Sequence, residues 1–132
     1  MKVRLYTDDE ISKLKQNMFV RNIKYKREIE YDPIFKLWSI MMRLKFPELS
    51  AREIFERGGF ETKILHNKLP QRRIKEWLDN YKRFGLRYFL LENEHYYSIS
   101  KNIVNSQEPD AFKLKLLKRI LENLKELENE NR

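Results

Sequence analysis

The sequence predicts a mainly α-helical protein, with a helix-turn-helix core of three to four helices and a long amphipathic C-terminal helix. Three observations predict this class. Apolar residues recur at helical spacing over 33–45, 51–57 and 70–84, and each of these segments has a cap residue or proline at its start and glycine or proline at its end. The chain has 132 residues, of which 41% are hydrophobic, with eight Phe and two Trp, so it can bury a core of one domain.

The first helix is predicted over residues 8–16. Thr7 and Glu10 have the spacing of a capping box, in which each side chain accepts a hydrogen bond from the other residue's backbone N–H.

Residues 19–31 are predicted to be extended or irregular. They mix charges with aromatic and β-branched residues, and Ile23, Tyr25, Ile29 and Tyr31 alternate with polar positions. The cations Lys24, Lys26 and Arg27 form either an arm against phosphates or a solvated linker.

The second helix is predicted from Pro33 to about residue 45. Asp32 suits the N-cap, Pro33 suits the first turn, and Phe46-Pro47 ends the helix. Its apolar stripe is Ile34, Leu37, Trp38, Met41 and Leu44. The tryptophan and the methionines are compatible with a ligand pocket, but the helical period favours core packing.

A third, short helix is predicted over residues 51–57. Ser50 and Glu53 form a second capping box, and Ala51, Ile54 and Phe55 are its inward positions. Gly58-Gly59 stops it, with one of the two expected in a left-handed conformation. Residues 60–69 are predicted to form a turn or another short helix, which carries Ile64 and Leu65.

The segment 70–84 is the most informative one. Ile74, Trp77, Leu78 and Tyr81 fall on one side of a helix that Pro70 can begin and Gly85 can end. The other faces carry amide and basic side chains: Gln71, Arg72, Arg73, Lys75, Lys82 and Arg83. A short amphipathic helix with such a start fits the major groove of DNA.

Residues 86–105 are apolar and aromatic in two bursts, around residues 88–91 and 96–99. Either a small β-hairpin or a helix–turn arrangement fits, and the turn-like Glu92-Asn93-Glu94 favours the hairpin. The last helix, 110–129, has a broad apolar face, with a seam at Leu114, Leu117, Leu121 and Leu124 and Phe112, Leu116 and Ile120 beside it. This face predicts either a homodimer or docking within the chain. Two heptads are short for an independent coiled coil, so docking within the chain is favoured.

Charge divides the chain. The formal net charge is +8, and the excess of Lys and Arg lies wholly in residues 1–85, since residues 86–132 hold eight basic and eight acidic residues. We therefore expect a DNA-binding domain at 1–85 and a packing or dimerisation region at 86–132. A basic composition that serves only solubility is the alternative.

Several classes are not expected. No stretch is apolar enough for a membrane span or a secretory signal, and the absence of Cys fits a cytoplasmic protein. His66 and His95 lack further ligands at metal-binding spacing, so we expect no metal and no cofactor. No phosphate loop or activated nucleophile is visible, and the sequence predicts no enzyme activity.

Residues 6–85 resemble the N-terminal helix-turn-helix domain of insertion-sequence transposases from Gram-positive bacteria. The motifs that match are an opening Tyr-x-x-x-Phe-Lys, a Ser-x-Arg-Glu-Ile-Phe-x-x-x-Gly-Phe core, and a closing Pro-x-Arg followed by Trp, Tyr and Gly. Their positions here are Tyr31, Phe35, Lys36, Ser50, Arg52, Glu53, Ile54, Phe55, Gly59, Phe60, Pro70, Arg72, Trp77, Tyr81 and Gly85.

This resemblance implies binding of double-stranded DNA by a regulator or helper of a mobile or domesticated element. A transposase would also carry a catalytic domain with three metal-binding acids, for which we expect no room here. The acids of 122–130 have no ligand geometry and predict a solvated face.

The predicted DNA-binding residues fall into two groups. On the helix 70–84, Gln71, Arg72, Arg73, Lys75, Glu76 and Arg83 would contact bases or phosphates. On the supporting helices, Lys36, Ser50 and Arg52 would contact phosphates, although Ser50 already has a role as a cap. The alternative for the first group is a set of surface ion pairs, Arg72–Glu76 and Asp79–Arg83.

Two rival functions stay open. One is a protein–protein adaptor that keeps the helix-turn-helix fold without binding DNA. The other is single-stranded or RNA binding through Tyr88, Phe89, Tyr96 and Tyr97, which the neutral charge of 86–132 disfavours against core packing.

Overall fold

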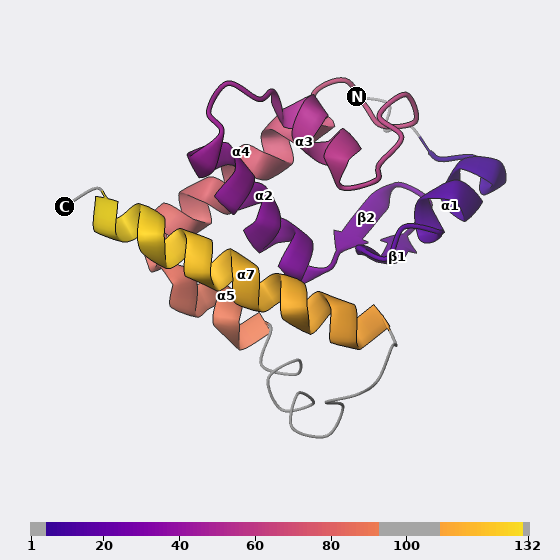
Figure 1. Ribbon diagram of the computed structural model, residues 1–132. Helices are drawn as coiled ribbons and strands as arrows, with labels where there is room; N and C mark the ends of the chain where they lie inside the picture. Colours follow the sequence, from indigo (N-terminus) through magenta and orange to yellow (C-terminus); the bar gives the residue numbers. More distant parts are fainter. Residues whose placement is uncertain (1–4, 93–108, 131–132) are drawn as a thin grey trace.

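The computed structural model describes residues 5–92 and 109–130 and confirms a mainly helical protein with one small hairpin (Figure 1). Its elements, in chain order, are α1 (Asp8–Lys15), β1 (Val20–Lys24), β2 (Glu28–Tyr31), α2 (Pro33–Lys45), α3 (Ala51–Arg57), α4 (Leu69–Phe84), α5 (Leu86–Glu92) and α7 (Pro109–Glu130). No helix in these two ranges combines the length and the apolar character that crossing a membrane requires.

The predicted helix starts are confirmed by their caps. The Thr7 hydroxyl accepts from the Glu10 N–H at 3.2 Å, and the Glu10 carboxylate accepts from the Thr7 N–H at 2.9 Å. Asp32 accepts from the Ile34 N–H, and Ser50 accepts from the Glu53 N–H at 3.1 Å. These bonds satisfy backbone donors that a helix leaves unpaired at its first turn.

Residues 20–31 form an antiparallel hairpin, which gives the predicted extended segment a definite structure. Ile23 lies opposite Ile29, and the pairing is irregular between Val20 and Asn22. The turn uses Tyr25 and Lys26, both at φ 55°, a left-handed conformation that side chains with a Cβ rarely adopt.

The hairpin predicted over 86–105 is wrong where the structure describes it, because residues 86–92 form helix α5. Its Phe89 is 1% exposed and belongs to the core. The second aromatic burst, with His95, Tyr96 and Tyr97, lies outside the described residues.

Helix α2 runs through the centre of the molecule and contacts α3, α4, α5 and α7 (Figure 1). The apolar stripe predicted for this helix was therefore too narrow, since Phe35 and Ile40, which lie outside it, are also fully buried. Neighbours on several sides remove the solvent-facing side on which a stripe prediction depends.

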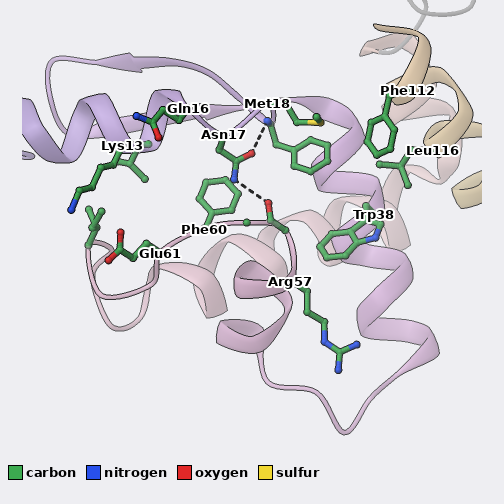
Figure 2. Close-up of a pocket in the computed structure, with 15 residues that line it drawn as sticks. Lys13, Gln16, Asn17, Met18, Trp38, Arg57, Phe60, Glu61, Phe112 and Leu116 are labelled. Carbon is green, nitrogen blue, oxygen red and sulfur yellow. Dashed lines mark hydrogen bonds between the residues drawn. The ribbon is translucent and has the colours of Figure 1, made fainter. Parts of the chain in front are cut away.

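The turn after α3 depends on both glycines. Gly59 has φ +90°, as predicted for one of the pair. Gly58 has a different role, since its missing side chain leaves space for the Phe35 ring. A Cβ at this position would overlap Cε1 of Phe35. The Asn17 amide holds this turn against the segment before β1, by donating to the Gly58 carbonyl at 3.0 Å and accepting from the Phe19 N–H at 2.8 Å (Figure 2).

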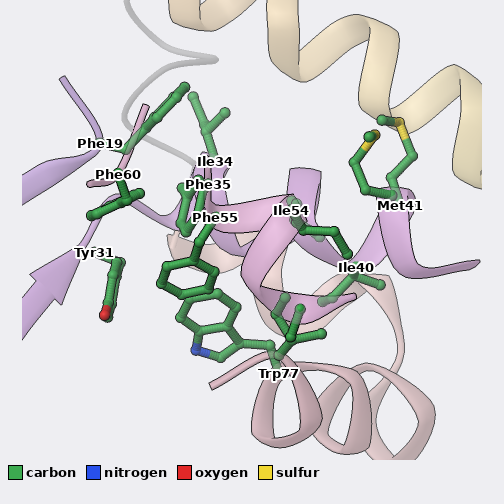
Figure 3. Close-up of a cluster of buried hydrophobic side chains, with 14 of the residues drawn as sticks. Phe19, Tyr31, Ile34, Phe35, Ile40, Met41, Ile54, Phe55, Phe60 and Trp77 are labelled. Carbon is green, nitrogen blue, oxygen red and sulfur yellow. The ribbon is translucent and has the colours of Figure 1, made fainter. Parts of the chain in front are cut away.

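The core is built around the Phe35 ring (Figure 3). Its centroid lies 4.9 Å from that of Phe60, 5.1 Å from that of Phe55 and 5.8 Å from that of Trp77. Tyr31 joins the same cluster edge-on to Trp77 at 5.1 Å. These rings come from the hairpin, α2, α3, the linker after α3 and α4, so one cluster holds the helix-turn-helix region together.

Helix α7 packs its apolar face on α2 within the same chain. Leu117, Ile120 and Leu124 are fully buried, which confirms the intrachain alternative for this face. Because α7 joins the same hydrophobic cluster, the predicted regions 1–85 and 86–132 share one core.

Three polar bonds fix the position of α7. Lys113 donates to the buried Asp32 carboxylate at 2.9 Å, and Lys45 donates to Asn123 at 2.8 Å. Lys113 of α7 contacts the N-cap of α2, and Asn123 of α7 contacts the last residue of α2. The chain therefore runs in the same direction along both helices. A third bond, from the Tyr81 hydroxyl to Glu128 at 2.6 Å, ties α7 to α4.

The Tyr81–Glu128 bond predicts a loss of stability at high pH. Burial, and then the Glu128 carboxylate, raise the pKa of Tyr81 above its ordinary value of 10.0. Above about pH 10 the unfolded chain releases a phenol proton that the folded chain keeps, so the free energy of unfolding falls as the pH rises. Urea unfolding at pH 8 and pH 11 should show a smaller fall for Tyr81→Phe than for the wild type. Equal falls in the two proteins would contradict this assignment.

Candidate nucleic-acid interface

Helix α4 is anchored by one face and presents the other to solvent. Pro70, Ile74 and Trp77 are buried, and Leu78 and Tyr81 are half-buried against the core. This confirms the predicted inward face. The helix stops as predicted at Gly85, whose φ is +75° and whose N–H donates to the Tyr81 carbonyl at 2.8 Å.

The outward face of α4 is basic. Four cations are exposed there, together with Gln71 and the acids Glu76 and Asp79; the four are Arg72, Lys75, Lys82 and Arg83. Within the described part of the chain, none of the four forms an ion pair. The alternative of surface ion pairs is therefore wrong as stated, because neither Arg72–Glu76 nor Asp79–Arg83 forms.

The start of α4 adds to this positive character. Lys68 occupies the N-cap with no side-chain capping bond, and the first turn contains no acid. The Leu69 N–H donates to the His66 carbonyl at 3.0 Å and Pro70 has no N–H, so the Gln71 N–H is the first-turn donor that can meet an anion, which the helix dipole also favours. The Gln71 and Arg72 side chains lie on the same turn, so a phosphate and a base edge are within reach together.

Arg83 lies at the other end of the helix. Twelve residues at about 1.5 Å each place it roughly 18 Å along the axis from Gln71. Its guanidinium stands over the Phe84 ring at 5.8 Å from the centroid. A duplex contacted by the start of α4 could meet Arg83 only at a separate phosphate.

Arg73 is directed differently from the four exposed cations of α4. The Arg73 guanidinium pairs with the Glu76 carboxylate at 3.0 Å, and the Arg73 side chain is 34% exposed. Burial raises the pKa of Tyr31, and the neighbouring Arg73 guanidinium acts in the opposite direction. Arg73 thus faces the hairpin side of α4 and is less accessible than Arg72.

A polar groove of about 390 Å³ separates this side of α4 from the hairpin. It gathers three cations, Arg21, Lys36 and Arg73, with three acids, Glu28, Glu30 and Glu76. The structure therefore brings Lys36 and Arg73 together, as part of a surface of balanced charge rather than a cationic one.

Ser50 and Arg52 have local structural roles. Ser50 caps α3, as the sequence suggested. Arg52 donates to the Thr62 hydroxyl at 3.1 Å, and that hydroxyl donates to Glu56 at 2.8 Å. These bonds fix the long linker between α3 and α4, a role that the sequence analysis missed because a threonine ten residues away gives no periodic signal.

The hairpin cations are largely neutralised. Lys24 pairs with Glu30 at 2.6 Å and Lys26 with Asp8 at 3.4 Å, while Arg27 stands over the exposed Tyr25 ring. The segment is neither a free arm nor a solvated linker, since it is a paired hairpin.

Comparison with models of protein families, with curated proteins and with solved structures finds no match to this chain.

Proposed function

We propose that this protein binds double-stranded DNA in a sequence-specific manner through the outward face of α4. The observation that carries the proposal is the exposure of Gln71, Arg72 and Lys75 on the first two turns of a helix whose opposite face is locked into the core by Ile74 and Trp77. A rigidly held helix can present guanidinium, amide and ammonium groups to base edges and phosphates without further ordering.

The arrangement of α3 and α4 supports this reading. A short helix, a linker fixed by Gly59, Asn17 and the Arg52–Thr62–Glu56 bonds, and a longer exposed helix follow one another, as in helix-turn-helix proteins. The resemblance to transposase domains extends the proposal to a cytoplasmic regulator or accessory factor of a mobile or domesticated element. Nothing in this proposal requires an enzyme activity or a cofactor.

We also propose that the protein is a homodimer. The α7 seam expected to form it is used inside the chain, so a dimer would need other surface. Symmetry of a selected DNA site would reveal a dimer independently, because two-fold proteins select two half-sites.

Selection of bound duplexes from a random library, followed by anisotropy titrations, tests the proposal. Arg72→Ala should weaken binding to the selected duplex by about 1–3 kcal/mol if Arg72 reads a guanine. Arg73→Ala should have a smaller effect, because its guanidinium is paired with Glu76. Failure to enrich any duplex, or a larger effect at Arg73 than at Arg72, would overturn the proposal.

A second candidate, a protein–protein adaptor, is favoured by one exposed aromatic pair. Phe84 and Tyr88 are 54% and 42% exposed and stack at 5.4 Å between centroids, at the corner between α4 and α5. Exposed aromatic side chains are enriched in protein interfaces. An adaptor would enrich no duplex in the selection, and reversal of charge at residues 72 and 73 would leave its partner binding intact.

A further inference from the structure

A groove of about 790 Å³ lies between α1, the start of the hairpin, α2, the turn after α3 and the start of α7 (Figure 2). We call it the Trp38 groove. Its apolar lining includes Met18, Phe19, Trp38, Phe60, Phe112 and Leu116. None of the described residues that line it belongs to α4, so it is separate from the proposed DNA-binding face.

Apolar side chains of the lining are partly exposed. Met18 and Phe112 remain 43% and 53% exposed, although hydrophobic partners surround them. The volume falls within the range of small-molecule sites, which are mostly apolar with a few polar groups that orient the ligand.

Charged side chains stand at the edge of the groove. Lys13 and Arg57 are exposed cations that form no ion pair with a described carboxylate, and Glu61 is the one acid in the described lining. Figure 2 shows Lys13 and Glu61 at one end and Phe112 and Leu116 at the other. The Asn17 amide is satisfied by backbone bonds, so it shapes the wall without competing for a ligand.

We propose that the Trp38 groove binds a free amphipathic monocarboxylate. The hydrocarbon part would lie along Trp38, Phe112 and Leu116, and the carboxylate would meet Lys13 or Arg57. A net excess of one cation at the edge matches a single negative charge.

The groove contains its own reporter. The chain has two tryptophans, Trp38 in the groove and Trp77 in the core, where it is 4% exposed. A Trp77→Phe variant therefore leaves Trp38 as the sole indole. Bromine quenches indole fluorescence on contact. Titration of this full-length variant with 12-bromododecanoate, kept below its micellar concentration, should therefore quench Trp38 with saturation at one ligand per chain.

Variants of the apolar lining and of the cations at the edge separate the parts of the proposal. Phe112→Glu should raise the Kd about tenfold through lost apolar contact and added repulsion. Phe84→Glu is its matched control, because Phe84 is equally exposed but lies outside the groove. The double variant Lys13→Gln/Arg57→Gln should raise the Kd by about fivefold, as expected for exposed ion pairs, and Lys118→Gln should leave it unchanged.

Three results would overturn the proposal. The first is no saturable quenching. The second is equal affinity for the neutral 12-bromododecanol, which would remove the role of the cations. The third is a dimer in sedimentation that Phe112→Glu dissociates, which would make a second copy of the chain the occupant. Each result is independent of whether α4 binds DNA.

Discussion

Replacement of Lys113 by alanine is expected to lower the free energy of unfolding by about 3 kcal/mol, the lower end of the range for breaking a buried ion pair. The Asp32 carboxylate is fully buried, and Lys113 is only 12% exposed. Without the ammonium group, Asp32 keeps the Ile34 N–H and Arg21, whose Nε lies 3.9 Å away, so the remaining charge is partly compensated. Urea unfolding at neutral pH measures the change.

The matched control for this prediction is Lys115→Ala. Lys115 is exposed on the same helix, so its loss should change stability by no more than about 0.5 kcal/mol. The double variant Asp32→Asn/Lys113→Met should recover most of the loss, because it removes both charges together. A change below about 1 kcal/mol for Lys113→Ala would mean that Asp32 needs no partner from α7.

Replacement of Gly58 by alanine is expected to destabilise the fold by about 3 kcal/mol, the upper end of the range for overpacking a core. Gly58 has φ −79°, so its backbone suits any residue. The loss comes from the added methyl, which would overlap Cε1 of Phe35, a ring that also contacts Phe55 and Phe60. Thermal or urea unfolding checks this value.

A double-mutant cycle identifies the cause. Phe35→Leu alone should be destabilising because it opens a cavity, but Gly58→Ala should then add much less than it does in the wild type. If the two effects simply add, the methyl does not meet Phe35. Retained stability in Gly58→Ala would contradict the close packing of this turn.

Local signals allowed much of the fold to be predicted from the sequence. Thr7, Asp32 and Ser50 mark helix starts because a cap acts within three residues of itself. The inward face of α4, with Ile74 and Trp77, could be predicted because only one side of this helix packs on the core. Its apolar residues therefore recur with the 3.6-residue period of a helix.

Features without a local signal in the sequence were missed. The hairpin turn uses Tyr25 and Lys26 in place of Asn-Gly, so the usual turn signal is absent. The burial of Phe35 and Ile40 depends on neighbours of α2 that its own period does not reveal. The same holds for the Asp32–Lys113 pair, which joins residues 81 positions apart.

For the candidate interface, spacing along α4 predicted which side of the helix is buried but not the surroundings of each outward side chain. Arg72 and Arg73 are adjacent in sequence, yet one is exposed and the other pairs with Glu76 beside the hairpin. A difference of 100° around the helix separates them, and only the position of the hairpin decides which one is covered.

The central claim, that the outward face of α4 meets a DNA duplex, is tested most directly by the salt dependence of binding. Wild-type protein and the Lys75→Gln/Arg83→Gln variant would be titrated onto one duplex at several salt concentrations, because these two exposed cations are the ones placed to meet phosphates. If both cations neutralise phosphates, the slope of log K against log salt should become shallower by about 1.8, since each contact contributes about 0.9. An identical slope in the two proteins, or no salt-sensitive binding by the wild type, would contradict the account.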